Sequence, residues 1–252
     1  LTDAVRHAVD YVGADADDIL GVGITVPGIL DDEKQILISA PPLKAKNYDF
    51  TRLISAIDYP VVVMNDARAE AYADHWFNGK PEDEKIYIML GEGVGGAYIN
   101  ASAIRNGVHN RGGEFGHMVI HPGGKQCLCG KKGCFEAYVS EKVLSSELDM
   151  TLDNFFELAA QGNKNNSNVL DEYMDNLALG INNIYTMMDC DIVLGGTVAP
   201  YLKQYDDSIK ERLVNDYSFD TDADYLRISD GGGRKSGLGA ALSFVARFID
   251  GV

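Results

Sequence analysis

The sequence predicts an α/β protein built as two layered lobes. Short runs of β-branched and other apolar residues, each with the profile of a buried strand, alternate along the chain with segments of helical length. The alternation falls into two blocks, and such a pattern is typical of layered α/β architectures. The chain has 252 residues, 46% of them hydrophobic, which suffices for one large domain or two modest lobes.

The first block opens with an amphipathic helix that is expected to end near Gly13, because glycine commonly terminates helices. A buried strand is predicted next, followed by a turn at Pro27 and Gly28. That buried strand covers 19–26. The remaining elements of this block are a short strand at 34–39, a loop at 40–48, a short helix at 50–57, a buried strand at 61–64 and a helix at 67–76.

The second block begins with a hairpin, in which the glycine-rich string GEGVGG connects two strands. Mostly helical segments follow, and one further strand ends in two glycines. The expected strands lie at 85–90, 97–100, 191–194 and 225–228, and the expected helices at 137–148, 152–161, 169–188, 206–214 and 238–248.

Composition excludes several classes of function. The net charge is −16, from 38 acidic and 22 basic residues, and no basic stripe offsets it, so this segment is not expected to bind nucleic acid by itself. No apolar run is long enough to cross a bilayer, and the chain does not begin with a signal peptide, so no membrane partner is expected. Four cysteines, three of them clustered, predict a reducing compartment and a cytoplasmic location.

The cysteine cluster predicts a metal site. Cys127, Cys129 and Cys134 are spaced C-x-C-x4-C, and Cys190 lies far away in an apolar run that is expected to be buried core. A C-x-C pair seldom reaches disulfide geometry, and three thiols are an odd number for bridging. Zinc prefers four tetrahedral ligands, often three cysteines and a histidine. We therefore predict a structural zinc ion with His117 or His121 as fourth ligand; the alternative is a set of reduced, unliganded thiols.

The strings EFGH and CLCGKKGCFE resemble the signature of the ROK family, named for repressors, open reading frames and kinases. In that family the histidine of the first string and the three cysteines hold zinc, which favours His117. The same histidine faces a sugar together with two glutamates, here Glu114 and Glu136. The resemblance runs from Val22 to the end of the chain. It implies the actin-like ATPase or sugar-kinase fold, with a first lobe over 1–83 plus 237–252 and a second over 84–236, which includes the zinc-binding segment 113–136.

Asn65 and Asp66 follow a buried strand, at the sheet edge where ligands collect in open α/β proteins. A carboxylate there has two possible uses. It can take the proton from a sugar hydroxyl that attacks a phosphate, or it can cap the helix that begins at Ala67. The family places the catalytic aspartate of its kinases in this NDA string. The resemblance therefore favours a site in which Asn65 and Asp66 face the sugar.

Two glycine turns resemble the nucleotide-binding turns of the family's kinases, although glycines also serve ordinary structural turns. The first holds Gly91, Gly93 and Gly95, and the second holds Gly195 and Gly196. The family's kinases usually carry threonine where this chain has Glu92, and an ionised carboxylate repels a triphosphate. Pro42 stands where many relatives have an asparagine that touches the sugar.

The front of the chain also departs from the family pattern. The family's first lobe opens with a strand pair carrying a D-x-G-x-T phosphate turn, and this chain begins at Leu1 without methionine and without such a turn. We therefore expect an N-terminal lobe that is truncated at its start.

These departures favour a sugar-binding effector domain of a ROK-family transcriptional repressor over an enzyme. DNA would be bound only through a winged helix outside this chain, and the string SEKVL is similar to the xylose-repressor branch. The alternative is an ATP-dependent sugar kinase with Asp66 as base and Mg-ATP as donor, and a third possibility is a scaffold that binds no sugar. The resemblance implies a homodimer, and the sequence leaves the identity of the sugar open.

Overall fold

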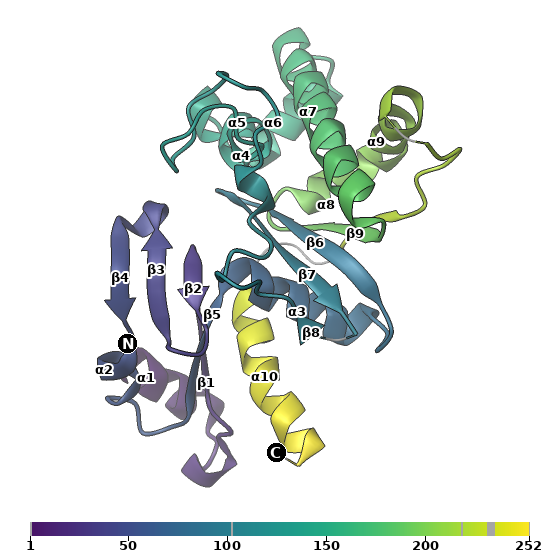
Figure 1. Cartoon of the computed structure of the whole chain (residues 1–252). Coiled ribbons are helices and arrows are strands. Elements are labelled where there is room, and N and C mark those ends of the chain that lie inside the picture. The colour runs from purple at the N-terminus through teal and green to yellow at the C-terminus, as the bar shows by residue number, and fades with distance from the viewer. Residues whose placement is uncertain (1, 102, 218, 231–234, 252) are drawn as a thin grey trace.

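Three β-sheets organise the computed structural model, which describes residues 2–101, 103–217, 219–230 and 235–251 (Figure 1). Two small sheets form one half of the molecule, and a five-stranded sheet with most of the helices forms the other. This arrangement confirms the predicted α/β class with two lobes. The division at residues 83 and 236 stays a prediction, and its outer limits, Leu1 and Val252, lie outside the described residues.

The first small sheet pairs β1 (Val22–Val26) with β5 (Val61–Asn65) in parallel, so that Val26 lies opposite Asn65 at the carboxyl ends of both strands. The predicted strand at 19–26 thus begins three residues later, after a short 3-10 helix, Ala16–Asp18. The N-terminal helix α1 (Thr2–Val12) has no buried residue and ends, as predicted, at Gly13, whose φ is +66°.

The second small sheet contradicts the prediction of a loop at 40–48. It is an antiparallel meander of β2 (Ile29–Asp31), β3 (Ile36–Ala40) and β4 (Ala45–Asp49), with a 3-10 helix at Pro41–Leu43 between the last two. Strands β2 and β4 were not expected, because β2 is short and β4, the polar edge strand AKNYD, has no apolar alternation. The helix expected at 50–57 is a single turn, α2 (Thr51–Ile54).

The large sheet has the strand order β10-β9-β6-β7-β8, with β6, β9 and β10 parallel and β7 and β8 antiparallel to their neighbours. The predicted hairpin is β6 and β7. The bounds are Glu84–Leu90 for β6, Val94–Asn100 for β7, Ala103–Ile104 for β8, Asp191–Gly195 for β9 and Leu226–Ile228 for β10.

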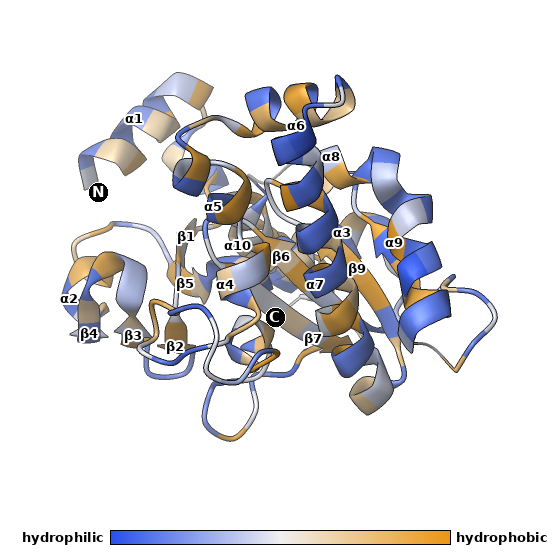
Figure 2. Cartoon of the chain, turned by 90° about the horizontal axis from the view of Figure 1, so that it is seen from above, coloured by the Kyte–Doolittle hydropathy of each residue, from blue (hydrophilic) through white to orange (hydrophobic). Residues whose placement is uncertain are grey.

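Helices pack on one face of the large sheet and enclose the main hydrophobic core, which includes Ile88, Leu177 and Leu194, each with no exposed surface (Figure 2). The bounds are Glu136–Val139 for α4, Glu141–Leu144 for α5, Leu152–Ala160 for α6, Lys164–Met188 for α7, Ala199–Leu202 for α8 and Asp206–Arg212 for α9, with short 3-10 helices at Ser146–Leu148 and Lys203–Tyr205 and a π-helical turn at Leu213–Tyr217.

Two helical predictions were wrong in detail, and one helix was missed. The helix expected at 137–148 is broken, because Ser140 is extended (ψ 158°) and separates α4 from α5. Helix α7 begins at Lys164 rather than near residue 169, because the side chain of Asn163 caps a polar first turn that carries little helical signal. Helix α8 was not expected. Cys190 is partly exposed, although it packs against the core as expected.

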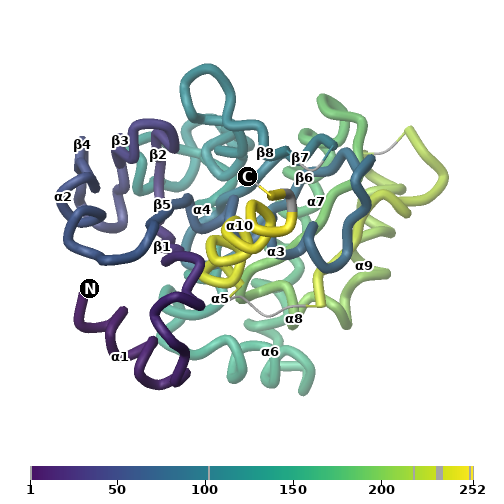
Figure 3. Tube along the Cα trace, turned by 90° about the horizontal axis from the view of Figure 1, so that it is seen from below, coloured from purple at the N-terminus to yellow at the C-terminus, as the bar shows by residue number. Residues whose placement is uncertain are grey.

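Two helices connect the halves. Helix α3 (Asp66–Asn78) continues from β5 and packs on β6 and β7, and α10 (Ser236–Asp250) crosses α3 and packs on β1 (Figure 3). The crossing is so close that a Cβ at Gly239 would lie 1.7 Å from the carbonyl oxygen of Ala69. The contacts of α10 with α3 and β1 agree with the predicted place of the C-terminal helix in the first lobe, which stays a prediction. Among the described residues, no helix has both the length and the apolar character to cross a membrane.

Candidate functional site

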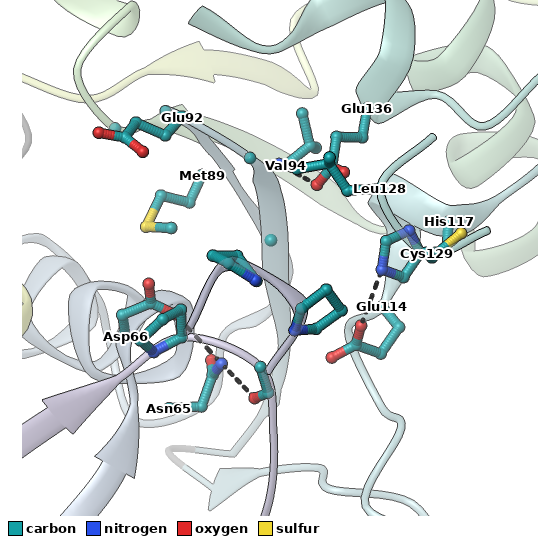
Figure 4. Close-up of a pocket in the computed structure, with 18 of the residues that line it drawn as sticks. Asn65, Asp66, Met89, Glu92, Val94, Glu114, His117, Leu128, Cys129 and Glu136 are labelled. Carbon is teal, nitrogen blue, oxygen red and sulfur yellow. Dashed lines mark hydrogen bonds and ion pairs between the residues drawn. The ribbon is translucent and has the colours of Figure 1, made fainter. Parts of the chain in front are cut away.

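A cavity of about 480 Å³ opens between the two halves of the molecule (Figure 4). Its walls come from the end of β5, the start of α3, the β6–β7 turn and the segment that holds the cysteines. Most of the residues predicted from the sequence meet in this cavity: Asn65, Asp66, Gly91, Gly93, Gly95, Glu114, His117, Cys129, Glu136 and Gly196. Gly195, Cys127 and Cys134 are not among its lining residues.

Asn65, not Asp66, caps helix α3. Asn65 Oδ1 accepts a hydrogen bond from Arg68 N at 2.9 Å, and Asn65 Nδ2 donates to the carbonyl of Gly28 at 2.9 Å. Asn65 Nδ2 also lies 3.2 Å from Asp66 Oδ1, which accepts from Ala67 N at 2.9 Å. Because the capping position is taken, the helix-cap alternative does not account for Asp66, whose carboxyl group lines the cavity opposite Glu114 and His117 (Figure 4).

The two carboxyl groups on opposite walls have perturbed protonation. Burial raises the pKa of Asp66 to about 6, and the negative charges of Glu70 and Glu114 contribute to the same shift. Burial also raises the pKa of Glu114, against the lowering effect of His117 and Arg68. Carboxyl groups whose pKa is raised by burial in a cleft are characteristic of functional sites, because such groups can exchange protons with a ligand.

His117 and the three clustered cysteines can hold a metal ion. Their candidate ligand atoms all lie within 4.8 Å of one another. His117 Nδ1 is 3.7 Å from Cys127 Sγ, and Cys129 Sγ is 3.7 Å from Cys134 Sγ. In a tetrahedral zinc site with Zn–S bonds of about 2.3 Å, neighbouring ligand atoms are about 3.8 Å apart. The residues therefore fit a tetrahedral ion, and three thiols with one imidazole are a donor set that suits zinc.

His121, the other candidate ligand, is engaged elsewhere. His121 Nε2 lies 2.6 Å from Asn176 Oδ1, and its ring meets that of Tyr138 edge-on, with ring centroids 4.7 Å apart. His117 instead joins the cysteines through Nδ1, and its Nε2 is 3.8 Å from Glu114 Oε2 (Figure 4). The imidazole of His117 thus connects the cysteine cluster to the wall of the cavity.

Glu136 ties the cysteine cluster to the first glycine turn. Its Oε2 accepts a hydrogen bond from Val94 N at 3.0 Å, and its Oε1 is 3.4 Å from Cys127 Sγ. A Cβ at Gly93 would lie 2.8 Å from Glu136 Oε2, so glycine allows this close approach of the carboxylate. One backbone amide of the predicted phosphate-binding turn is therefore already bonded to a carboxylate of the protein.

The second glycine turn has the same feature. Gly196 N donates a hydrogen bond of 2.9 Å to Glu70 Oε1, which also accepts from the hydroxyl of Tyr87 at 3.0 Å. Gly196 has φ +84°, in the region that favours glycine, and a Cβ at Gly195 would meet the Tyr87 hydroxyl at 1.7 Å. Local backbone conformation and packing therefore explain why glycine stands at both positions.

Glu70 lines the cavity and was missed from the sequence. A signal existed, because Asp66, Glu70 and Asp74 are spaced four apart and so share one face of α3. Burial raises the pKa of Glu70, although the bonds from Gly196 and Tyr87 oppose the shift.

The cavity as a whole is acidic. Among the described residues that line it, five are carboxylates and one is a lysine: Asp66, Glu70, Glu92, Glu114 and Glu136 against Lys142.

The raised pKa of Asp66 predicts a stability difference that depends on pH. Because the pKa of Asp66 is higher in the folded chain than in the unfolded chain, ionisation of this group lowers the free energy of unfolding. The loss grows from about pH 3.8, the ordinary pKa, to about pH 6, and it is complete above that pH. We expect Asp66→Asn to raise the free energy of unfolding by about 1 to 3 kcal/mol at pH 7.5 and to have little effect at pH 4. Urea unfolding at both pH values checks this. An equal effect at both pH values would contradict it.

Comparison with known proteins finds the family that the EFGH and CLCGKKGCFE strings resemble. The family model described as "ROK family" matches residues 1–245. The chain is 29% identical to a xylose repressor of Bacillus subtilis over 201 residues, which are 77% of this chain and 52% of the repressor. It is 35% identical to a glucokinase of Streptomyces coelicolor over 146 residues, which are 57% of this chain and 46% of the glucokinase. The chain thus spans about half the length of these curated relatives.

Among solved structures, a ROK family glucokinase from Streptomyces griseus in complex with glucose and AMPPNP superposes with a TM-score of 0.80 and 25% identity. The superposition covers 96% of this chain and 86% of the glucokinase. The predicted actin-like sugar-kinase fold is confirmed by this likeness. The relatives include both repressors and kinases, and the family model matches nearly the whole sequence. The chain belongs to the ROK family.

Proposed function

We propose that this chain is the sugar-binding effector domain of a ROK-family transcriptional repressor. The observation that carries the proposal is that a carboxylate of the protein occupies one backbone amide in each glycine turn. Val94 N donates to Glu136, and Gly196 N donates to Glu70. A phosphate group would need such amides free, because N–H groups are what a glycine-rich turn offers an anion.

The charge of the cavity supports the same proposal. Glu92 lines the cavity at the end near Met89, on the opposite side from His117 (Figure 4). With Glu70 and Glu136 it surrounds the two glycine turns with negative charge. Like charges within a few ångströms repel strongly in a partly buried site, so a triphosphate is disfavoured there. A neutral sugar has no such conflict.

A sugar suits the opposite part of the cavity. Asp66 and Glu114 offer carboxylate oxygens from facing walls, and the imidazole of His117 lies beside Glu114. Such a set of donors and acceptors can hydrogen-bond a ring of hydroxyl groups. We infer that the ion held by the cysteines is a structural zinc, which would fix His117 and the start of α4 and thereby the sugar-binding wall.

DNA binding is proposed only for a segment outside this chain. The net charge of −16 opposes contact of this domain with a phosphate backbone. In a sugar-responsive repressor, the sugar shifts the balance between DNA-binding and released states by its different affinity for each. A homodimer and a cytoplasmic location, which the family resemblance implies, stay predictions.

The second candidate is an ATP-dependent sugar kinase, and Asp66 is the observation that favours it. A carboxyl group with a pKa of about 6 on the wall of the cavity can act as a general base toward a sugar hydroxyl near neutral pH. In this reading magnesium and ATP would have to displace Glu70 and Glu136 from the glycine turns.

A turnover assay separates the two functions. With Mg-ATP and a panel of neutral pentoses and hexoses, we expect the chain to bind at least one sugar and to form no sugar phosphate above the level of Asp66→Asn. Binding would be measured by calorimetry, and ADP formation by a coupled assay. Turnover of about 1 s⁻¹ or more that disappears in Asp66→Asn would establish the kinase instead.

A further inference from the structure

A second cavity, of about 490 Å³, lies next to the first and shares a wall with it. The shared residues are Gly28, Pro41, Glu114, His117, Leu128 and Cys129. Each cavity alone falls within the range of about 300 to 1,000 Å³ that is usual for small-molecule sites. We call the first the inner chamber and the second, which extends along β3 and β4, the outer chamber.

The two chambers differ in charge. The inner chamber has five carboxylates and one lysine among its described lining residues. The outer chamber has Lys44 and Lys46 against the single carboxylate of Glu114, together with the imidazole of His117. An anionic group on a ligand is therefore repelled from the inner chamber and attracted to the outer one.

Both lysines are available to a ligand. Within the described part of the chain, neither side chain forms an ion pair or hydrogen bond. Lys46 lies opposite Ser39 in the β3–β4 ladder, and both residues line the outer chamber. Lys44 has a left-handed backbone (φ +52°), held by a hydrogen bond of 3.1 Å from its N–H to the Pro41 carbonyl. A non-glycine residue in this conformation is strained, and such strain is often kept at ligand sites.

An apolar side chain stands where the chambers meet. Leu128 is 64% exposed although it is large and hydrophobic, and it lines both chambers. Its neighbours in the chain, Cys127 and Cys129, belong to the candidate metal cluster. Leu128 thus offers an apolar surface to the C–H face of a ligand that passes from one chamber into the other.

We propose that the site binds an acidic disaccharide or longer saccharide, with an uncharged sugar unit in the inner chamber and a uronate unit in the outer one. The carboxylate of the outer unit pairs with Lys44 and Lys46. This inference rests on the proposed sugar-binding function and extends it, because two joined chambers of opposite charge select the length and the charge of the ligand.

Calorimetry with two matched series of sugars tests the inference. One series is glucose, cellobiose and glucuronosyl-β-1,4-glucose, and the other is xylose, glucosyl-α-1,2-xylose and glucuronosyl-α-1,2-xylose. Within each series the two disaccharides differ only by a carboxylate in place of a hydroxymethyl group. In at least one series we expect the acidic disaccharide to bind about tenfold more tightly than the neutral one. The double variant Lys44→Gln/Lys46→Gln is expected to lose that preference and to keep the affinity for the monosaccharide.

A matched control removes two charges elsewhere. Lys34→Gln/Lys80→Gln changes two exposed lysines that do not line either chamber, and it should keep the tenfold preference. Binding of a monosaccharide without any preference for the acidic disaccharide would overturn the outer chamber and leave the proposed function standing. A preference that the control variant also loses would overturn it too, because long-range charge would explain it. No binding of any sugar in either series, or in the panel of neutral pentoses and hexoses, would overturn both proposals.

Discussion

Replacing Cys129 or Cys134 with serine is expected to remove the metal ion and to weaken sugar binding by more than about 100-fold. A serine hydroxyl is a poor replacement for a thiolate ligand. The segment from Val119 to Cys134 contains no helix or strand. One isolated bridge, Val119 with Cys134, connects its ends, and a second, Gln126 with Lys132, lies inside it. In structural zinc sites the metal supplies about 10 to 16 kcal/mol of apparent binding free energy, much of it as folding free energy.

Loss of the ion should therefore disorder residues 117–136 and displace the imidazole of His117 and the carboxylate of Glu136 from the cavity. Metal content by mass spectrometry should fall from about one ion per chain to near zero. Hydrogen exchange should quicken within 117–136, and calorimetry should show the loss of sugar affinity. A chelator strong enough to remove the ion should reproduce all three results with the unaltered chain.

Two comparisons make this prediction decisive. Cys190→Ser alters a thiol outside the cluster, so it should keep the metal and the affinity. Cys134 is fully buried, so Cys134→Ser alone could fail through packing, whereas Cys129 is partly exposed. If Cys129→Ser retains both metal content and sugar affinity, the coupling of the metal to the sugar site is wrong.

Replacing Arg68 with methionine is expected to lower the free energy of unfolding by about 2 to 4 kcal/mol and sugar affinity by about tenfold. Arg68 is buried, and its Nη1 lies 3.0 Å from Asp32 Oδ2 in the loop between β2 and β3. Its Nη2 donates to the carbonyl of Asn110 at 2.9 Å. Removing one partner of a buried ion pair typically costs 3 to 5 kcal/mol, and the range here is lower because Asp32 is about one-third exposed.

The affinity falls because Arg68 joins three walls of the cavity. It lies two residues after Asp66 in helix α3. Through Asp32 it contacts the β2–β4 meander, which also carries Pro41 of the cavity wall, and through the carbonyl of Asn110 it contacts the loop that leads to Glu114. Asn106 strengthens the contact, since its Nδ2 donates to Asp32 Oδ2 at 2.6 Å. Arg68→Lys should restore little, because one ammonium group cannot reach both partners in the geometry of a guanidinium group.

Urea unfolding and calorimetry measure the two effects of Arg68→Met separately. Arg6→Met is the control, because it breaks an exposed ion pair with Asp3 and should cost at most about 1 kcal/mol. Adding Asp32→Asn to Arg68→Met should recover part of the stability, since no unpaired carboxylate then remains. A loss of stability without any loss of affinity would refute the positioning role of Arg68.

Local features of the sequence determined the family, the α/β class and much of the site. The three clustered cysteines and His117 lie within 18 residues of one another, so their spacing alone brings these candidate ligands close together. Asp66 directly follows strand β5, which places it at a sheet edge whatever the rest of the fold does. Such signals can be recognised from the sequence alone because they depend on short stretches of chain.

Other features depend on contacts between distant segments, and only the tertiary structure decided them. Strand β4 is polar and forms because β3 supplies its hydrogen-bond partners. Glu70 accepts a hydrogen bond from the amide of Gly196 across 126 residues of sequence, so one amide of the predicted phosphate-binding turn already has a partner. Lys44 and Lys46 line one cavity with Leu128 only because the meander folds toward the cysteine-containing segment. A sequence motif records which groups are present, whereas the fold decides which of them are already bonded.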